Sequence, residues 1–236
     1  MITFKYFLTS IVCILTFSIQ SCKEKEDKIV PNDSAEQSTY ANDDFSLQQE
    51  SEQVVNEATN IFSRAGNVRE AESLNLCGLL NIDTIAPNSY LLKFNGRSCD
   101  GKSRREGNIL VTLTGSTWPT AGSNILIDFQ GYKLTRADGK YFTLVGQINT
   151  TNLNGGLVSS LRIGSPAVVH SIYSNNLNLT FDDGSVKTWN TSRKKTIIRT
   201  ASGLEVKLEG NGKIDGFTNA GFWGKNRKGN DFLAFL

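Results

Sequence analysis

The chain has 236 residues, of which 39% are hydrophobic, and its 25 Lys and Arg nearly balance its 23 Asp and Glu. This length supplies one substantial domain and a tether rather than several domains. One histidine and four cysteines, none in CxxC spacing, make a poor ligand set for a metal centre. We therefore expect no metal and no other cofactor.

The N-terminal residues have the three-part form of an export signal. Lys5 supplies a short positive segment, residues 6–19 form an apolar core too short to span a bilayer comfortably, and Ser21 precedes Cys22. The arrangement resembles the bacterial lipoprotein leader, in which Cys22 receives a diacylglycerol and becomes the first residue after cleavage. We predict a signal peptide over residues 1–21 and a lipid anchor at Cys22. An ordinary signal peptide with an incidental cysteine is the alternative.

Two segments connect the anchor to the domain. Residues 22–45 are polar and rich in acids, which is typical of a flexible tether. The next segment, 46–72, begins with Ser46 as a candidate helix cap, and Gly66 can end the helix. Its apolar residues recur at helical spacing: Val54, Val55, Ala58, Ile61 and Phe62. We expect a short amphipathic helix docked on the domain, with a helix that binds a partner as the alternative.

From residue 73 onward the apolar pattern changes to a period of two. Apolar and polar residues alternate in four runs: 109–114, 124–129, 177–182 and 204–209, the last with Leu204, Val206 and Leu208 on the apolar face. Hairpin dipeptides lie at 100–101, 138–139, 154–155, 183–184 and 211–212. The sequence predicts an all-β domain over 73–236. It should be an antiparallel meander of about eight strands that forms a curled sheet or sandwich.

The cysteines divide by position. Cys13 leaves with the leader and Cys22 carries the lipid, so Cys77 and Cys99 remain in an oxidising compartment. We predict a disulfide between them, which would close a loop of 23 residues. The chain-entropy estimate for such a loop is roughly 3 kcal/mol of stabilisation.

The charges are distributed unevenly along the chain. Residues 22–72 carry 5 basic and 12 acidic residues, a net −7, whereas residues 73–236 carry 19 and 11, a net +8. This predicts a basic body on an acidic stalk. Three basic clusters are candidates for contact with lipopolysaccharide or an acidic glycan: Lys102, Arg104 and Arg105; Arg193, Lys194 and Lys195; Lys225, Arg227 and Lys228. Solvated hairpin ends are the alternative, and nucleic acid is not an expected partner of an exported protein.

Groups with catalytic potential are sparse. The only histidine, His170, has no GxSxG motif near it, and we expect a hydrogen-bonded strand histidine. The acids that a glycosidase would need lie mostly in turns or on exposed strand faces. Trp118, Trp189 and Trp223 could stack on sugar rings, but filling the core is the stronger expectation. The sequence assigns no catalytic residue.

Two stretches carry a family resemblance: CDGKSRREGNILVTLTG, followed by GSNILIDFQGY, and the hairpin LTFDDGSVKTWNTSRKKT. The Cys-DG-basic-RxG turn and the DGxxxW hairpin are similar to those of uncharacterised outer-membrane lipoproteins of Bacteroidetes-type bacteria. The resemblance implies an envelope location and an all-β fold. Members of that family usually continue with another strand and a cysteine, so a shortened C-terminus and a different pairing of Cys77 and Cys99 stay open.

Together these patterns predict a lipid-anchored cell-envelope protein on the periplasmic or surface side of the outer membrane. Its expected role is non-enzymatic, in binding or structural support, and its oligomeric state is open. The alternative is a glycan-active enzyme or an accessory subunit of a polysaccharide-utilisation system. Two facing carboxylates beside a tryptophan would favour the enzyme, and an apolar or purely basic surface would favour binding.

Overall fold

The computed structural model describes residues 34–63, 76–214 and 216–236, with side chains from residue 42 onward. The predicted leader and Cys22 lie outside these residues. The chain divides into two compact units, Met1–Asp44 and Phe45–Leu236. Of the first unit, only the beginning of the helix α2 (Ser34–Ser63) is described. No helix among the described residues is long and apolar enough to cross a membrane.

Helix α2 begins earlier than predicted. It has 30 residues, so the prediction of a flexible tether over 22–45 is wrong for residues 34–45. Neither Gly nor Pro interrupts the sequence from 34 to 63, and nothing local opposes a helix there. The apolar spacing that reveals an amphipathic helix starts only at Leu47, which is why the pattern located only the second part.

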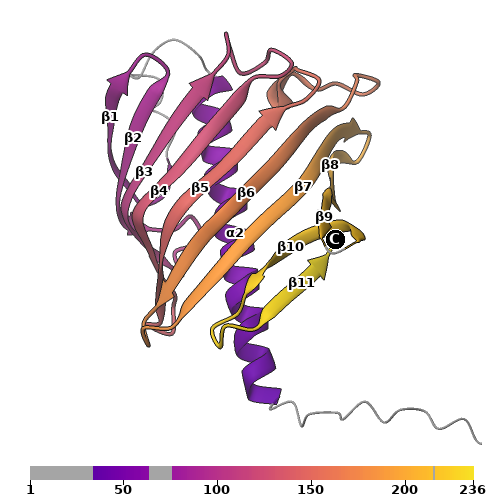
Figure 1. Cartoon of the computed structure of the whole chain (residues 1–236). Helices are drawn as coiled ribbons and strands as arrows, with labels where there is room; N and C mark the ends of the chain where they lie inside the picture. The colour runs from indigo at the N-terminus through magenta and orange to yellow at the C-terminus, as the bar shows by residue number, and fades with distance from the viewer. Residues whose placement is uncertain (1–33, 64–75, 215) are drawn as a thin grey trace, which may run out of the picture. The chain divides into compact units, whose positions relative to one another are not determined.

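The second unit is an antiparallel sheet, as the sequence predicted, with eleven strands rather than about eight (Figure 1). Its order is β1-β2-β3-β4-β5-β6-β7-β10-β11, with β8 and β9 paired to β7 and β10. The strands are β1 Leu79–Ala86, β2 Ser89–Arg97, β3 Arg104–Thr114, β4 Asn124–Thr135, β5 Tyr141–Asn152, β6 Val168–Phe181, β7 Val186–Thr200, β8 Gly203–Gly210, β9 Gly212–Ile214, β10 Phe217–Lys225 and β11 Asp231–Phe235. A short 3₁₀ helix, Val158–Ser160, lies between β5 and β6. Four of the five predicted hairpin dipeptides fall between strands, and the fifth, at 211–212, includes the first residue of β9.

The sheet curls because irregularities interrupt the pairing of four consecutive strands. Register shifts occur at Gly107 in β3, Gly131 in β4, Gly146 in β5 and Asn176 in β6, and each of these residues has positive φ. Bulges of this kind bend a strand and increase its twist. A side chain at Gly107 would place its Cβ 2.6 Å from the carbonyl oxygen of Gly131, so the close approach of β3 and β4 there requires glycine.

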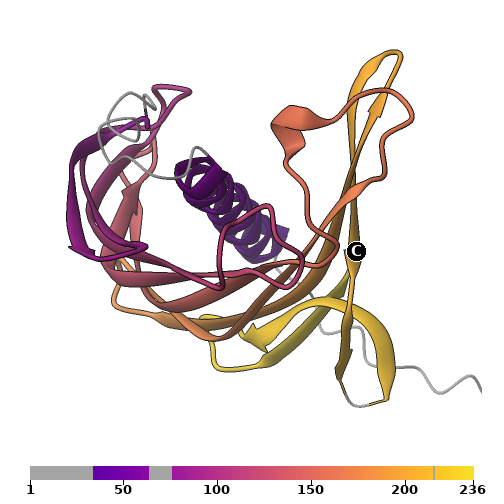
Figure 2. The same ribbon diagram turned by 90° about the horizontal axis from the view of Figure 1, so that it is seen from above.

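The core lies in the concave side of the curled sheet. From Phe45 onward α2 runs along this hollow, which Figure 2 shows from above. Leu47 and the five predicted apolar positions of the helix are at most 5% exposed and form one cluster with the inward residues of the strands. The inward residues predicted for runs 109–114, 124–129 and 177–182 are buried as expected.

The run in β8 behaves differently from the prediction. Leu204 and Val206 are 50% and 51% exposed, so their assignment to a core face is wrong. None of the apolar residues of β8 belongs to the main core cluster. The strand pairs with the C-terminal part of β7, Arg193–Thr200, and the end of this hairpin extends past α2 in Figure 2. An alternating pattern therefore identified the strand but not the layer that would cover it.

Candidate functional site

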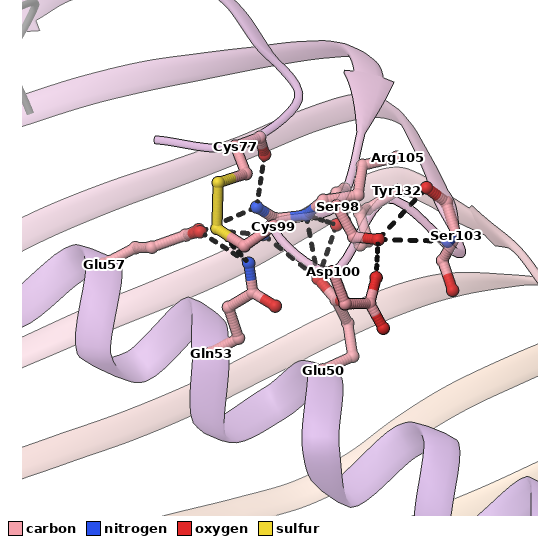
Figure 3. A network of polar contacts seen from close by, with 10 residues as sticks. All are labelled: Glu50, Gln53, Glu57, Cys77, Ser98, Cys99, Asp100, Ser103, Arg105 and Tyr132. Carbon is pink, nitrogen blue, oxygen red and sulfur yellow. Dashed lines mark hydrogen bonds and ion pairs between the residues drawn. A yellow bond between two sulfur atoms is a disulfide. The ribbon is translucent and has the colours of Figure 1, made fainter. Parts of the chain in front are cut away.

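The most connected polar group in the second unit is the guanidinium of Arg105. The residue lies in β3 opposite Gly96 of β2 and Leu134 of β4, and it points toward α2 (Figure 3). It is 0% exposed. Two carboxylates of the helix, Glu50 and Glu57, come from positions seven residues apart, which lie on one face after about two turns. They meet Arg105 from two sides.

Each nitrogen of the Arg105 guanidinium donates to at least one acceptor. Nη1 and Nη2 donate to the two oxygens of Glu57 at 2.7 and 2.8 Å, and Nη1 also donates to the carbonyl oxygen of Cys77 at 2.8 Å. Nε donates to Glu50 Oε1 at 3.1 Å and to the hydroxyl of Tyr132, while Nη2 lies 3.0 Å from the same Glu50 oxygen. The Arg105 guanidinium also lies 4.3 Å from the centre of the Phe94 ring. All three nitrogens of the guanidinium therefore donate hydrogen bonds.

Burial and charge shift the acidities in this network. Burial raises the pKa of Glu50, although Arg105 and the hydroxyl of Tyr132, which donates to Glu50, act in the opposite direction. Burial also raises the pKa of Tyr132 well above its usual value, and the charge of Glu50 adds to the shift. Burial alone would lower the pKa of Arg105, but the hydrogen bond to Glu57 and the charge of Glu50 outweigh it and raise the pKa. The guanidinium therefore remains charged.

The predicted disulfide is present and borders this network. Cys77 and Cys99 are joined, with their Cα atoms 5.0 Å apart. The adjoining β2–β3 loop is held by its own side chains, because Ser98 Oγ donates to Asp100 and the backbone N–H of Lys102 donates to Asp100 at 2.9 Å. These bonds lower the pKa of Asp100. Gln53 of α2 donates to Glu57 at 3.0 Å and lies 3.7 Å from Cys99 Sγ, which connects helix, disulfide and loop (Figure 3).

A cleft of about 190 Å³ opens beside the network. Pockets for drug-sized ligands are usually about 300–1,000 Å³, so this cleft is small. Its wall is polar and contains no aromatic side chain: Ser46, Gln49, Glu50, Gln53, Ser98, Cys99, Asp100, Ser103, Leu134 and Arg136. The cleft can accept a few polar atoms but offers no stacking surface for a sugar ring.

A second buried ionic cluster lies on β7. The side chains of Arg193 and Lys195 are 0% and 8% exposed, and one carboxylate, Glu52 of α2, meets both of them. Glu52 Oε2 accepts from Lys195 Nζ at 3.0 Å, and Asn56 Oδ1 accepts from the same nitrogen at 3.0 Å. Glu52 Oε1 lies 2.7 Å from Arg193 Nη1, but the contact does not have hydrogen-bond geometry. Burial lowers the pKa of Arg193, and Glu52 offsets this only in part.

His170 is buried in β6 opposite Lys195 of β7 and lies 5.1 Å, centre to centre, from the ring of Trp118. Its Nε2 has no hydrogen-bond partner, so the expectation of a fully hydrogen-bonded strand histidine is wrong for that atom. Burial, and then the charge of Lys195, lower the pKa of His170 to about 4, with Glu52 acting in the opposite direction. The imidazole is therefore neutral at neutral pH.

The structure separates the nine predicted polyanion-binding residues into two groups. Arg105, Arg193 and Lys195 are buried and face α2, so they are not exposed for the predicted contact with a polyanion, and the alternative of solvated hairpin ends is wrong for them as well. Arg193 and Lys195 lie within β7 rather than at its end, and Arg105 is the second residue of β3. The other six are exposed or half-buried: Lys102, Arg104, Lys194, Lys225, Arg227 and Lys228.

At least four of these six surface cations have acidic neighbours, among them Arg104, which lies 3.4 Å from Glu106. Lys194 lies 3.4 Å from Glu209, and Lys225 lies 2.8 Å from Asp231. Arg227 lies 3.1 Å from Asp183 and 3.5 Å from the centre of the Phe181 ring. The three clusters therefore do not form one open basic surface.

Trp118 and Trp189 are 2% and 1% exposed and fill the core, as the sequence analysis expected. Trp223, in β10, is half-buried. Glu50, Glu57 and Tyr132 were not among the site residues predicted from the sequence. A signal for the two acids was available, because they share the helical face of the apolar residues Val54 and Ala58 and so had to be buried with them.

None of the known protein-family models, curated proteins or solved structures matches this chain. In the described ranges no group of three or more His, Cys, Asp or Glu side chains gathers as metal ligands would. The site must therefore be interpreted from its own geometry.

Proposed function

We propose that this chain is a lipid-anchored envelope protein with a non-enzymatic role in binding or structural support at the outer membrane. The leader and Cys22 support the location. One structural observation supports the non-enzymatic part: Glu50, Glu52 and Glu57 of α2 each contact a buried cation of the sheet. They fix the helix to the sheet.

A glycan-active enzyme is the second candidate, and the geometry favours it less. Glycosidases need two carboxylates that flank a substrate, with a gap of roughly 5–9.5 Å between them. Glu50 and Glu57 instead converge on one guanidinium and are 3% and 7% exposed. No tryptophan lines the adjoining cleft.

The test of the non-enzymatic role is an activity and binding screen with the full chain. We expect retention on some glycans or envelope fractions without release of reducing sugar. Hydrolysis that is lost in Glu50→Gln and kept in Asn60→Ala, a change at an exposed position of the same helix away from the cleft, would establish the enzyme instead.

The anchor has its own test. Cys22→Ser should abolish labelling by a fatty-acid probe and release the protein from the membrane fraction, because thioether attachment requires the thiol. Cys13→Ser, within the leader, is the control and should leave labelling unchanged. Labelling that persists in Cys22→Ser would refute the anchor.

We retain contact with a polyanion as part of the proposed binding role, but through fewer residues than the sequence predicted. Lys102 and Arg104 are exposed beside the cleft, on the β2–β3 hairpin. Charge attraction between exposed groups is screened over about 8 Å at physiological salt. Retention on immobilised lipopolysaccharide should therefore fall with salt and with Lys102→Ser/Arg104→Ser, but not with Lys140→Ser on the β4–β5 hairpin. Equal retention by all three proteins would remove this contact.

A further inference from the structure

The two buried arginines that face α2 differ in how completely they are paired. Arg105 donates from all three of its nitrogens, to two carboxylates, Glu50 and Glu57, a tyrosine hydroxyl and a backbone carbonyl. Arg193 is equally buried, at 0% exposed, but among the described residues its contacts are one ion pair with Glu52 and cation–π contacts with Phe222 and Trp189. Its Nε, Nη1 and Nη2 atoms all lack a hydrogen-bond partner. Buried polar groups are normally hydrogen-bonded, and an orphaned buried guanidinium requires an explanation.

Two of the Arg193 atoms that lack hydrogen-bond partners lie on the same edge of the guanidinium. Nε and Nη2 form the side edge of the guanidinium, which presents two parallel N–H groups to a carboxylate. In Arg105 this edge faces Glu50, with Nε and Nη2 at 3.1 and 3.0 Å from the same oxygen. In Arg193 only Nη1, at the other side, approaches a carboxylate. The edge that Glu50 occupies in the first cluster is without a partner in the second.

The charge balance of the two buried clusters also indicates that the second one lacks a negative partner. The first cluster has one buried cation and two carboxylates, whereas the second has two buried cations, Arg193 and Lys195, and the single carboxylate of Glu52. Both charges of the second cluster are largely removed from water, at 0% and 8% exposure. One further negative charge would neutralise it, and pairing is the usual condition for a buried charge.

Apolar walls flank the same guanidinium. Its carbon atom lies 5.1 Å from the ring centre of Phe222 in β10 and 5.9 Å from that of Trp189 in β7, and the two rings are 5.1 Å apart. A ligand held by the Nε–Nη2 edge would therefore have aromatic surface beside its non-polar part.

We propose that Arg193 is the anchor of a buried binding site for the carboxylate of a small monocarboxylic acid with a short apolar tail. Its Nε and Nη2 donate to the two carboxylate oxygens, Lys195 adds positive charge, and Trp189 and Phe222 contact the tail. The site lies between β7, β10 and α2 and is separate from the cleft beside Arg105. It does not depend on the lipid anchor.

The experiment uses butyrate as the probe and the full chain purified in detergent. Butyramide has nearly the same shape without the charge, and sodium chloride at matched ionic strength supplies an anion without the planar carboxylate. We expect butyrate to bind in calorimetric titration and to raise the melting temperature, because a ligand that binds only the folded state stabilises it. Butyramide and chloride should do neither.

Two variants locate the site. Arg193→Lys keeps the charge but removes the two-donor edge, and it should weaken butyrate binding at least about tenfold while the protein stays folded by circular dichroism. Arg104→Lys, at an exposed position of β3, should bind as the unchanged protein does. Absence of butyrate binding, equal effects of butyrate and chloride, or undiminished binding by Arg193→Lys would each overturn the proposal. The proposed envelope role would survive any of these results, since it rests on Cys22 and on the pairing of the α2 acids.

Discussion

At the scale of single residues, the ionic contacts under α2 are the positions where a small change should have the largest effect. A buried charge that loses its partner typically costs about 3–5 kcal/mol, whereas exposed ion pairs contribute about 1 kcal/mol or less. Arg105 holds two buried carboxylates, so its removal leaves both of them in the core with only Tyr132, Gln53 and each other nearby.

We therefore expect Arg105→Met to lower the free energy of unfolding by roughly 3–5 kcal/mol in urea titrations. Arg104→Met is the control, because that side chain is 53% exposed, and it should change the value by less than about 0.5 kcal/mol. Adding Glu50→Leu and Glu57→Leu to Arg105→Met should recover most of the loss. A small effect of Arg105→Met would show that the two carboxylates are not held by it.

His170 should make stability depend on pH. Its pKa is lowered to about 4 in the folded protein from an ordinary value near 6.5, so the unfolded chain binds the proton more readily. The stability that the neutral imidazole contributes is therefore present above about pH 6.5 and is lost as the pH falls toward 4, by about 3 kcal/mol in total.

The measurement is a series of urea titrations between pH 4 and pH 7.5 on the unchanged protein and on His170→Phe. The difference between their slopes isolates the imidazole, because Glu50, whose pKa is raised by burial, contributes equally to both proteins and with the opposite sign. The stability that protonated Glu50 contributes to the folded protein is fully present below the ordinary pKa of a glutamate and is lost as the pH rises. Parallel curves for the two proteins would contradict the assignment.

At the scale of elements, the bend in the sheet depends on glycines within strands. Gly107 has φ +97° and a neighbouring backbone oxygen 2.6 Å from where a Cβ would lie, whereas Gly139, in the β4–β5 hairpin, has φ +82° and open space around that position. Comparing alanine at the two positions separates the strain of a positive φ from the clash between strands.

We expect Gly139→Ala to cost about 1–2 kcal/mol of unfolding free energy, which is the cost of the left-handed backbone alone. Gly107→Ala should cost a further 1–3 kcal/mol or so, as overpacking of a close contact does. Chemical denaturation of the two variants provides the measurement. Equal losses at both positions would mean that β3 and β4 can separate without cost, and the bulge would then not fix the curl.

Elements were predictable from the sequence to the extent that their pattern is local. Alternation located the strands, and hairpin dipeptides located the turns. The isolated glycines in REGNI and QGYKL were available as signs of bulges, since glycine within a strand often marks one. Alternation could not show which sheet faces are covered by another element. Leu204 and Val206 alternate with polar residues as Ile109 and Val111 do, but they have no helix over them. The pairing of Arg105 with α2 depends on which face of the sheet the helix lies against, and this is determined by the tertiary structure and not by the local sequence.

At the scale of the whole second unit, the structure gives a different explanation for the uneven distribution of charge along the sequence. Residues 22–72 are acidic and 73–236 are basic, which suggested a stalk and a body with separate partners. Three of those acids and three of those bases instead meet each other: Glu50, Glu52 and Glu57 with Arg105, Arg193 and Lys195. Part of the charge difference between the two segments is therefore explained by ion pairs that hold the helix on the sheet.

This docking predicts how the sheet should behave without its helix. A chain of residues 73–236 would expose the apolar concave face and three cations that are otherwise buried, and most helical stability in proteins comes from packing of this kind. We expect that chain to bind a hydrophobic dye and to lack native near-ultraviolet circular dichroism. Adding a peptide of residues 45–63 should restore the native signals in proportion to its concentration. Native signals without any peptide would show that the helix is dispensable for folding.

The ionic part of the docking can be measured with two further peptides. Replacing Glu50, Glu52 and Glu57 with Gln leaves the shape almost unchanged but removes the charges that the buried cations require, so restoration should need at least about ten times more peptide. A peptide with Gln49→Ala and Asn60→Ala, two exposed positions of the same helix, is the matched control and should act as the unchanged peptide does. If the three-glutamine peptide restored the fold equally well, apolar burial alone would hold α2. The buried cations would then have to be satisfied by something other than the helix.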